Sequence, residues 1–562
     1  MDIKEQANFI WSIADLLRGN FKQSEYGKVI LPFTVLRRFD CVLAPSKEEI
    51  LERNKSLAVS NKAPIFKKYT GHDYYNVSKF DFEKLIDDSN NIDTNLKDYI
   101  NGFSDDVKEI LDNFEIATII EKLKKAGLLY LVVQKFSEIN LGADTIDNLE
   151  MGYMFEELIR KFSEQSNETA GEHFTPREVI ELMVEVLLDT NLDEITTTDG
   201  KVITILDPAC GTGGMLSIAQ NKIRALNSRT TVVPFGQELN PETYATCKSD
   251  MILKNNTNSK IVFGNSFSED GFREQKFDYI LSNPPFGVEW KKVKNFIENE
   301  SKHKGYDGRF GAGTPRISDG SLLFLQHMIS KMQPIEKGGS RIGIVFNGSP
   351  LFSGDAGSGE SEIRKWIIEK DLLEAVIGLP DQLFYNTGIS TYVWILTNRK
   401  TDRRKGKIRL INGTSFFGKM RKSLGNKRNE ITESDRKEIV RLYSTYEHDE
   451  NYIDFDNDDF GYRKITIERP LYDENREVVV EKGNPKPNSK LRDTETVPFK
   501  EDIHEYFKRE VLPHVPDAWI DEKKTKIGYE IPFTRHFYKF TPLRESSVIL
   551  DEIKQLEEKI QK

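Results

Sequence analysis

The stretch from Val202 to Met215 most narrows the folds that this chain can adopt. A β-prone run, Val202 to Leu206, leads directly into Asp207-Pro-Ala-Cys-Gly-Thr-Gly-Gly214. A buried strand, a glycine-rich turn and a helix in this order form the first unit of a doubly wound α/β sheet, which binds its ligand at the carboxyl ends of the strands. The turn lacks the Gly-Lys-Ser/Thr ending of a P-loop. We therefore predict a doubly wound sheet whose ligand approaches the backbone of the turn closely.

Two further predicted strands also end in polar residues. Val232 to Gln237 is followed by Glu238, close to the spacing of roughly 20 residues at which an acid accepts the hydroxyls of a ribose. A capping or surface glutamate is the alternative at this position. A third strand, Ile261 to Phe263, ends in Gly264-Asn-Ser-Phe267. Polar groups thus follow successive strand ends, where folds of this type bind their ligands.

The fourth predicted strand, Tyr279 to Leu281, is followed by the turn Asn283-Pro284-Pro285-Phe286. Proline has no N–H, so the turn offers carbonyl acceptors and almost no donors, and the side chain of Asn283 adds another carbonyl. Such a turn suits a substrate with two N–H donors on one nitrogen, such as the exocyclic amine of a nucleobase or a primary amide. Phe286 supplies a flat face for stacking. The alternative is a Pro-Pro turn at the end of a buried strand, without a function.

Residues 1 to about 165 are predicted to be helical, because apolar residues recur at helical spacing. Examples are Phe9, Ile10, Ile13, Leu16 and Leu17. We expect an accessory domain here, with Arg37 and Arg38 either solvated or in contact with nucleic acid. Thr175, Pro176 and Glu178 then predict the start of the next helix as a capping box.

Two later segments are expected to lack regular structure for most of their length. One is a polar loop from Phe286 to about Gly320, a length that is usually functional or disordered. The other is the charged, proline-rich stretch 470–530, which we interpret as a linker with a short helix around Ile503 to Val511.

The charge balance limits how the chain can bind nucleic acid. Its net charge is −10, whereas a protein that binds DNA unaided usually carries a basic excess. Between Arg403 and Arg428, however, ten Lys or Arg residues occur without an acid, which indicates a phosphate-binding surface or a solvated connector. Three cysteines without CxxC spacing argue against a zinc site and for a reducing cytoplasm. The sequence contains no apolar run of about 18 residues, so it predicts no membrane span.

Read together, five motifs resemble those of amino-methyltransferases that use S-adenosylmethionine. They are Gly171-Glu-His-Phe-Thr-Pro176, Asp207-Pro-Ala-Cys-Gly-Thr-Gly-Gly214, Glu238, Gly264-Asn-Ser-Phe267 and Asn283-Pro-Pro-Phe286. Their order resembles that of enzymes that methylate adenine N6 in DNA. The closest likeness is to the modification (methylation) subunit of type I restriction-modification systems, and it covers most of the chain, less securely beyond about residue 430. His173 departs from the aromatic ring that the family often has there.

This resemblance implies S-adenosyl-L-methionine as the cofactor, no metal, and a role for each motif. The implied cofactor-binding residues are Glu172, His173, Phe174, Thr175, Pro176, Arg177, Asp207, Gly211, Thr212, Gly213, Gly214, Glu238, Asn265 and Ser266, and the implied catalytic residues are Asn283, Pro284, Pro285 and Phe286. Glu238 would bind the ribose, and Asn265 and Ser266 would flank the adenine of the cofactor. The target adenine would leave the duplex, because its N6 cannot be reached within the stack. Its N6 hydrogens would bind Asn283 and the Pro284 carbonyl, and its ring would stack on Phe286.

The resemblance also implies how the chain is organised and what it binds. It predicts a helical domain at 1–165, a Rossmann-like catalytic domain at 166–430 and an extension at 431–562. The extension ends in a narrow apolar seam that is suited to docking on a partner helix, formed by Ile549, Ile553, Leu556 and Ile560. The implied partners are a DNA-specificity subunit flanked by two copies of this chain, a motor-nuclease restriction subunit and double-stranded DNA. Methylation of RNA bases or protein glutamine, and a non-catalytic scaffold of a DNA-bound complex, are the alternatives.

Overall fold

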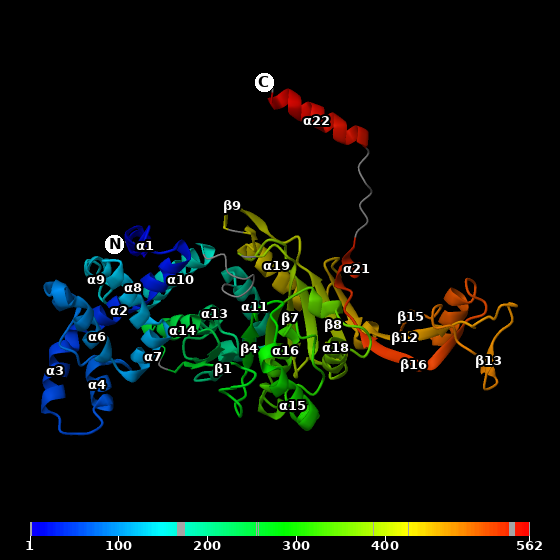
Figure 1. The fold of residues 1–562 in the computed structure, drawn as a ribbon, viewed down its shortest axis with the longest axis horizontal. Coiled ribbons are helices and arrows are strands. Elements are labelled where there is room, and N and C mark those ends of the chain that lie inside the picture. The colour runs from blue at the N-terminus through cyan, green and yellow to red at the C-terminus, as the bar shows by residue number, and fades with distance from the viewer. Residues whose placement is uncertain are drawn as a thin grey trace.

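The computed structural model describes residues 3–560, apart from 166–174, 255, 257, 386, 425 and 539–545. A helical bundle lies at one end, a large mixed sheet with helices on both faces lies in the middle, and a small antiparallel sheet stands out at the other end (Figure 1). No helix within these described ranges is long and apolar enough to cross a membrane.

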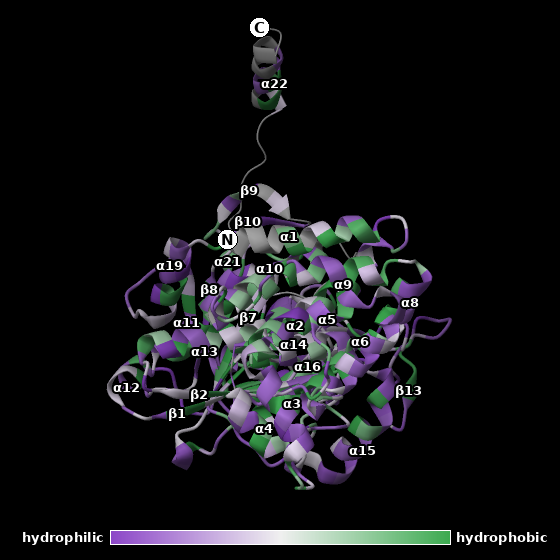
Figure 2. Ribbon diagram, turned by 90° about the vertical axis from the view of Figure 1, so that its left-hand side faces the viewer, coloured by the Kyte–Doolittle hydropathy of each residue, from purple (hydrophilic) through white to green (hydrophobic). Residues whose placement is uncertain are grey.

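The N-terminal region is helical, as the apolar spacing predicts. Its helices are α1 (Ile3–Leu17), α2 (Tyr26–Leu43), α3 (Lys47–Ser56), α4 (Ala63–Thr70), α5 (Phe82–Asp87), α6 (Ile92–Asn101), α7 (Asp105–Asn113), α8 (Ile116–Lys125), α9 (Leu129–Ser137) and α10 (Asn148–Gln165). Hydrophobic and hydrophilic residues alternate along them (Figure 2), and the apolar faces of all of them except α3 and α4 form one core. Ala245 and Leu253 of α14 (Pro241–Leu253) belong to the same core, so the bundle packs against a helix of the central region.

The side chains of Arg37 and Arg38 bind backbone carbonyls within the bundle. The Arg37 guanidinium donates to the carbonyls of Ser137 and Ile139 and pairs with Asp40 at 2.7 Å. Arg38 is fully buried and donates to the carbonyls of Leu141 and Ile146. Both expectations were therefore wrong for Arg38, because a sequence does not show that a buried loop with free carbonyls lies opposite it. Arg37 is partly buried.

The central sheet has nine strands in the order β11-β8-β6-β7-β5-β4-β1-β2-β3. These are β1 (Val202–Asp207), β2 (Thr231–Glu238), β3 (Lys260–Phe263), β4 (Tyr279–Ser282), β5 (Arg341–Asn347), β6 (Leu373–Gly378), β7 (Thr391–Thr397), β8 (Lys407–Asn412) and β11 (Tyr452–Asp456). β1 to β5 pair in parallel, while β7 lies antiparallel between β5 and β6. The predicted doubly wound sheet is thus confirmed, and its strand order reverses between β1 and β4.

Successive side chains of each strand point to opposite faces of the sheet, and they are buried in two cores, one on each face. On one face Leu281 packs with α11 (Arg177–Asp189), α13 (Gly214–Leu226) and α19 (Glu433–Ser444). On the other face Ile280 packs with α16 (Ser321–Ser330) and α18 (Gly359–Glu369). Helices on both faces explain why β4 is buried along its whole length and therefore appears in the sequence as an apolar run.

The two segments expected to be irregular contain regular structure. The stretch after Phe286 forms α15 (Lys294–Lys304), held by a small core of Trp290, Ile297 and Phe310. Residues 470–530 are not a linker: β15 (Asp493–Pro498) and β16 (Trp519–Tyr529) pair on either side of β12 (Gly461–Glu468). One face of this small sheet is exposed and charged, so its strands lack the apolar runs by which β1 and β4 were recognised.

The remaining elements are short. They are α12 (Leu192–Thr197), α17 (Ser349–Phe352), the hairpin of β9 (Gly418–Leu424) and β10 (Lys427–Glu430), β13 (Val480–Glu481), β14 (Asn484–Pro485), α20 (Ile503–Tyr506), α21 (Phe533–Phe537) and α22 (Ser546–Ile560). α20 lies at the start of the short helix expected around Ile503 to Val511. In Figure 1 the terminal helix α22 stands apart from the body of the molecule.

Candidate active site

The polar residues at the ends of β1, β2, β3 and β4 meet at one edge of the sheet. The parallel register aligns Asp207 with Gly236 of β2, Glu238 with Phe263 of β3, and Leu206 with Ile280 of β4. The carboxyl ends of these strands therefore lie at one edge of the sheet, at the point where the strand order reverses and where folds of this type bind their ligands.

The glycine-rich turn after β1 needs glycine at two positions. Gly211 and Gly213 have φ of 54° and 84°, in the left-handed region that favours glycine. A Cβ on Gly213 would also lie 2.7 Å from Sγ of Cys247 on α14, a distance that forces something to shift. Around Gly211 a Cβ would meet nothing within 4 Å, so the turn presents open backbone there. Helix α13 starts directly after the turn and directs its first N–H groups toward it.

Asp207 is a buried acid at the centre of this edge. Its Oδ1 accepts a hydrogen bond from Ala209 N at 3.0 Å and another from Ser282 Oγ at 2.9 Å, which joins the ends of β1 and β4. Burial raises the pKa of Asp207 to about 7, although both hydrogen bonds favour the charged form. A cationic ligand beside this carboxyl would favour its ionised form.

Glu238 and Ser266 connect neighbouring turns. Glu238 Oε2 accepts from Gly211 N at 2.9 Å and Oε1 accepts from Asn240 N at 2.7 Å. A carboxylate has further lone pairs beyond these two bonds, so it can still accept hydroxyl groups. Ser266 Oγ donates to the Pro208 carbonyl at 2.5 Å. Oδ1 of the preceding Asn265 accepts a hydrogen bond from Phe267 N at 2.9 Å.

The turn after β4 contains a buried acceptor without a partner. Asn283 Nδ2 donates to Thr175 Oγ1 at 2.9 Å. Its Oδ1 is buried and has no hydrogen-bond partner among the residues that the structure describes, and leaving such a group unpaired costs free energy. Pro284 is buried, whereas Pro285 is half-buried. Phe286 is also half-buried and packs edge-on against Phe384, with 6.3 Å between the ring centroids.

The predicted capping box at the start of α11 does not form. The helix begins at Arg177, and Pro176 caps it without a side-chain hydrogen bond. The Thr175 hydroxyl contacts Asn283 instead, across the site, and this contact cannot be inferred from spacing along the chain. Arg177 pairs with Glu181 of its own helix at 3.2 Å. Glu172, His173 and Phe174 lie outside the described residues.

The structure therefore brings most of the predicted residues to one edge of the sheet. The contacts of Thr175 with Asn283, Asp207 with Ser282 and Glu238 with Gly211 link separate motifs. Sequence reasoning missed the neighbours of these motifs, among them Phe384 and Arg309, because each comes from a segment without a motif of its own.

Comparison with known proteins agrees with this geometry. A family described as N-6 DNA Methylase matches residues 147–460, and one described as HsdM N-terminal domain matches residues 6–136. The chain belongs to the N-6 DNA methylase family. The expected resemblance to modification subunits of type I restriction-modification systems is thereby confirmed, as is the expected class of enzyme, an adenine-specific DNA methyltransferase.

Relatives of this N-6 DNA methylase include two methylase subunits of type I restriction enzymes. The MjaIX subunit of Methanocaldococcus jannaschii is 26% identical over 487 residues, which are 82% of this chain and 80% of that protein. The HindI subunit of Haemophilus influenzae is 31% identical over 280 residues, 49% of this chain and 55% of that protein.

Solved structures show the same fold. The type I restriction-modification methyltransferase subunit from Streptococcus thermophilus has a TM-score of 0.66 at 22% identity, covering 82% of this chain and 97% of that one. A putative type I modification subunit from Vibrio vulnificus has a TM-score of 0.53 at 18% identity, covering 85% and 95%.

Proposed function

We propose that this chain transfers a methyl group from S-adenosylmethionine to N6 of an adenine that has left the DNA duplex, with Asn283-Pro-Pro-Phe286 holding the target base. The observation that supports this most is the buried Asn283 Oδ1, which has no partner within the described part of the chain. Thr175 accepts from Nδ2 and so holds the amide in one orientation, which leaves Oδ1 as the acceptor for the target amine. An amine with two hydrogens fits such an acceptor together with the Pro284 carbonyl.

The residues at the sheet edge fit the proposed cofactor. Residues 172–177 and the turn from Asp207 to Gly214 would hold its methionine part, with the buried Asp207 carboxyl as the acid nearest to a positive charge. Glu238 would accept the ribose hydroxyls while it keeps its bonds to the turn, and Asn265 with Ser266 would flank the adenine. When bound, the cofactor supplies a methyl group activated by a sulfonium.

The protein's own part in the reaction is to position the target base. Asn283 and the Pro284 carbonyl would accept the two N6 hydrogens, so that the nitrogen lone pair points out of the base plane. Phe286, supported by Phe384, would stack on the base and keep it out of the duplex. Alignment of nucleophile and methyl group in a water-poor site can supply much of the rate.

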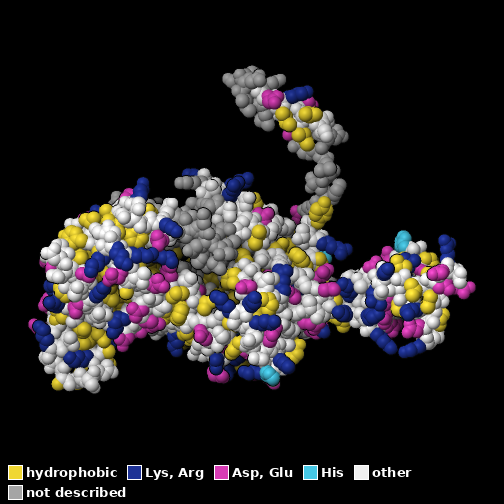
Figure 3. Space-filling view, viewed as in Figure 1, with side chains coloured by type: hydrophobic (Ala, Val, Ile, Leu, Met, Phe, Trp, Pro, Cys, Tyr) yellow, Lys and Arg dark blue, Asp and Glu magenta, His cyan; other side chains and the backbone are white. Residues whose placement is uncertain are grey.

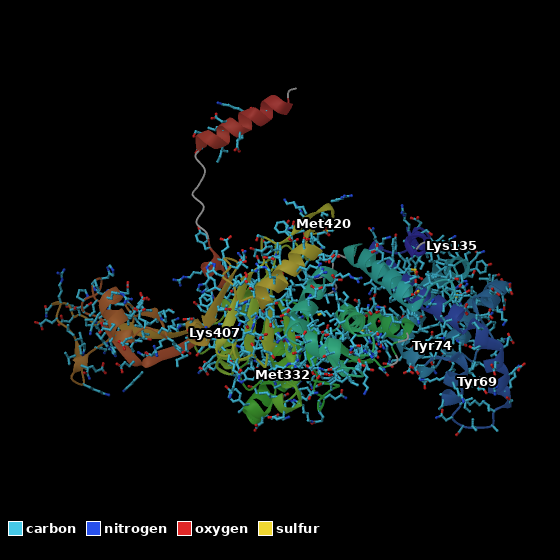
Figure 4. The ribbon with its side chains drawn as sticks, turned by 180° about the vertical axis from the view of Figure 1, so that it is seen from behind. Tyr69, Tyr74, Lys135, Met332, Lys407 and Met420 are labelled. Carbon is cyan, nitrogen blue, oxygen red and sulfur yellow. The ribbon has the colours of Figure 1, made fainter. Side chains whose placement is uncertain are left out.

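Only part of the basic segment from Arg403 to Arg428 is available to contact DNA. Arg404, Arg409 and Lys427 are buried, and they bind the Tyr443 carbonyl, Asp454 and Glu178. Of the exposed basic residues in this segment, Lys419, Arg421 and Arg428 lie on the β9–β10 hairpin, whereas Arg403, Lys405 and Lys407 lie at the start of β8 or just before it. Figure 3 shows Lys and Arg side chains around the β9–β10 hairpin. In Figure 4, Met420 of this hairpin lies well apart from Lys407.

The hairpin stands beside the proposed target-base site. Asn426 N donates to the Tyr385 carbonyl at 2.8 Å and Arg428 N donates to the Gln382 carbonyl at 2.9 Å. The segment between these acceptors contains Phe384, the neighbour of Phe286. We therefore place phosphate contacts of the flipped strand on this hairpin.

The partners proposed are a DNA-specificity subunit flanked by two copies of this chain and a motor-nuclease subunit, within the cytoplasm. On α22 the side chains of Ile549, Leu550 and Ile553 are 42%, 55% and 46% exposed, as expected of a helix that docks elsewhere. Truncation at Leu543 should leave cofactor binding unchanged and weaken co-purification with the specificity subunit. Normal assembly of the truncated chain would contradict this part.

Three variants test the assignment of the site. Asn283→Ala and Phe286→Ala should abolish methyl transfer and retain binding of S-adenosylhomocysteine, measured by calorimetry, because both residues face the base. Glu238→Ala should instead weaken that binding. If the first two variants lose cofactor affinity, the assignment is wrong; if the wild-type chain binds no cofactor, the scaffold alternative holds.

A further inference from the structure

Arg309 lies directly behind the loop that carries Asn265 and Ser266. Its Nη1 donates to the Ser266 carbonyl at 2.9 Å and its Nη2 to the Phe267 carbonyl at 2.6 Å. The side chain is only 13% exposed, so these bonds form away from solvent. One guanidinium thus binds two consecutive carbonyls of the loop that carries Asn265 and Ser266 at the end of β3.

The guanidinium is itself fixed from two helices. Glu300 of α15 accepts from Arg309 Nε at 3.1 Å, from Nη2 at 2.7 Å and from the Arg309 backbone N at 2.9 Å. His327 of α16 places Nδ1 3.2 Å from Nη1. Burial and the nearby Arg309 charge lower the pKa of His327 to about 3, so its ring is neutral and can accept this bond at neutral pH.

The neighbouring charges are balanced, which lets the cluster remain buried. Lys331 pairs with Asp270 at 2.6 Å, and the same Asp270 oxygen lies 3.9 Å from Arg309 Nη1. Arg309 and Lys331 therefore face Glu300 and Asp270, two cations against two anions. A buried pair of this kind keeps one geometry, because breaking it leaves an uncompensated charge.

The loop held by Arg309 is joined to the glycine-rich turn. Ser266, whose carbonyl binds Arg309, donates its hydroxyl to the Pro208 carbonyl at 2.5 Å. Phe267 packs on Phe324 of α16 with 4.5 Å between ring centroids, close to His327. The contacts run without interruption from Glu300 through Arg309 and Ser266 to the turn after β1.

We infer that Arg309 is a positioning residue for the adenine end of the cofactor site: through the carbonyls of Ser266 and Phe267 it sets where Asn265 and Ser266 meet the adenine. The inference rests on the proposed cofactor role of that loop. Lysine cannot replace this arginine, because one ammonium cannot bind a carboxylate in bidentate fashion and two carbonyls at once.

The test is binding of S-adenosylhomocysteine and of 5′-methylthioadenosine, which lacks the amino-acid part, to the full chain. Arg309→Lys should weaken both ligands by a similar factor of roughly 10, because charge-assisted hydrogen bonds are lost behind the shared adenosine end. In methylation assays the KM for S-adenosylmethionine should rise while kcat at saturation changes little.

Arg364→Lys is the matched control. Arg364 is also fully buried and donates to the carbonyls of Tyr529 and Pro350, neither of which belongs to the loop of Asn265 and Ser266 or to the glycine-rich turn. It should lower thermal stability without changing either ligand's affinity. If Arg309→Lys does not fold, Glu300→Gln loosens the same guanidinium and should weaken both ligands in the same direction.

The inference is overturned if Arg309→Lys, or Glu300→Gln in its place, binds both adenosine ligands as the wild type does. It is also overturned if only S-adenosylhomocysteine is weakened, since the effect would then lie at the methionine end. A wild-type chain that binds neither ligand would refute the proposed cofactor site itself, which is a different result.

Discussion

Thr175→Val tests whether the contact across the site sets the orientation of the Asn283 amide. Valine keeps the shape of threonine but cannot accept the hydrogen bond that Asn283 Nδ2 makes to Oγ1 at 2.9 Å. Without it, the amide can rotate and exchange its nitrogen and oxygen, so that Oδ1 no longer faces the target amine. A typical hydrogen bond contributes about 0.5–1.5 kcal/mol, which corresponds to roughly a 2- to 13-fold loss of correctly oriented enzyme.

We expect this loss in kcat, measured at saturating S-adenosylmethionine and DNA with the assembled complex. Thr175→Ser keeps the hydroxyl and should stay within about twofold of the wild type, since its bond to the amide is retained. An unchanged kcat for the valine variant would refute the reasoning. An equal loss in the serine variant would show that the methyl group, and not the hydrogen bond, matters.

Three further predictions concern the turn, the buried acid and the helical bundle. Gly213→Ala should lower thermal stability more than Gly338→Ala, because both have positive φ but only the first Cβ would strike a neighbour, Cys247 Sγ at 2.7 Å. Asp207 has a pKa raised from 3.8 to about 7 in the folded chain, so it binds its proton more tightly than in the unfolded chain and stability is lost as pH rises from about 4 to 7. Asp207→Asn should therefore stabilise the ligand-free protein more at pH 8 than at pH 4, in unfolding experiments at both pH values, and an equal effect would contradict this. Arg38→Gln should destabilise the chain by roughly 1–3 kcal/mol for each buried carbonyl left unpaired, measured by denaturant unfolding.

The catalytic sheet could be predicted from the sequence because its strands are buried on both faces. β1 and β4 appear in the sequence as short apolar runs. β1 ends at the glycine-rich turn, and β4 ends at Asn283-Pro-Pro-Phe286. Their alignment at one edge follows from parallel pairing alone. The domain limits at 165 and 430 stay a prediction, although β11 at Tyr452–Asp456 pairs with β8 of the central sheet.

Elements with one exposed face were missed. β16 carries lysines on its solvent side, and α15 follows a glycine-containing loop, so neither shows the pattern of a buried element. Long-range contacts also leave no local signal. The buried Arg38, and the Arg309 guanidinium behind Ser266, resemble any surface arginine until their partners are placed in space.

The most direct test of the account is single-molecule sequencing of host DNA from cells that carry the wild-type gene, the gene with Asn283→Ala, or no gene. The account predicts N6-methyladenine at a recurring motif in the first strain only, because the base is held by the acceptor at Asn283 Oδ1. Adenine methylation that is identical in all three strains, or that persists with Asn283→Ala, would contradict it.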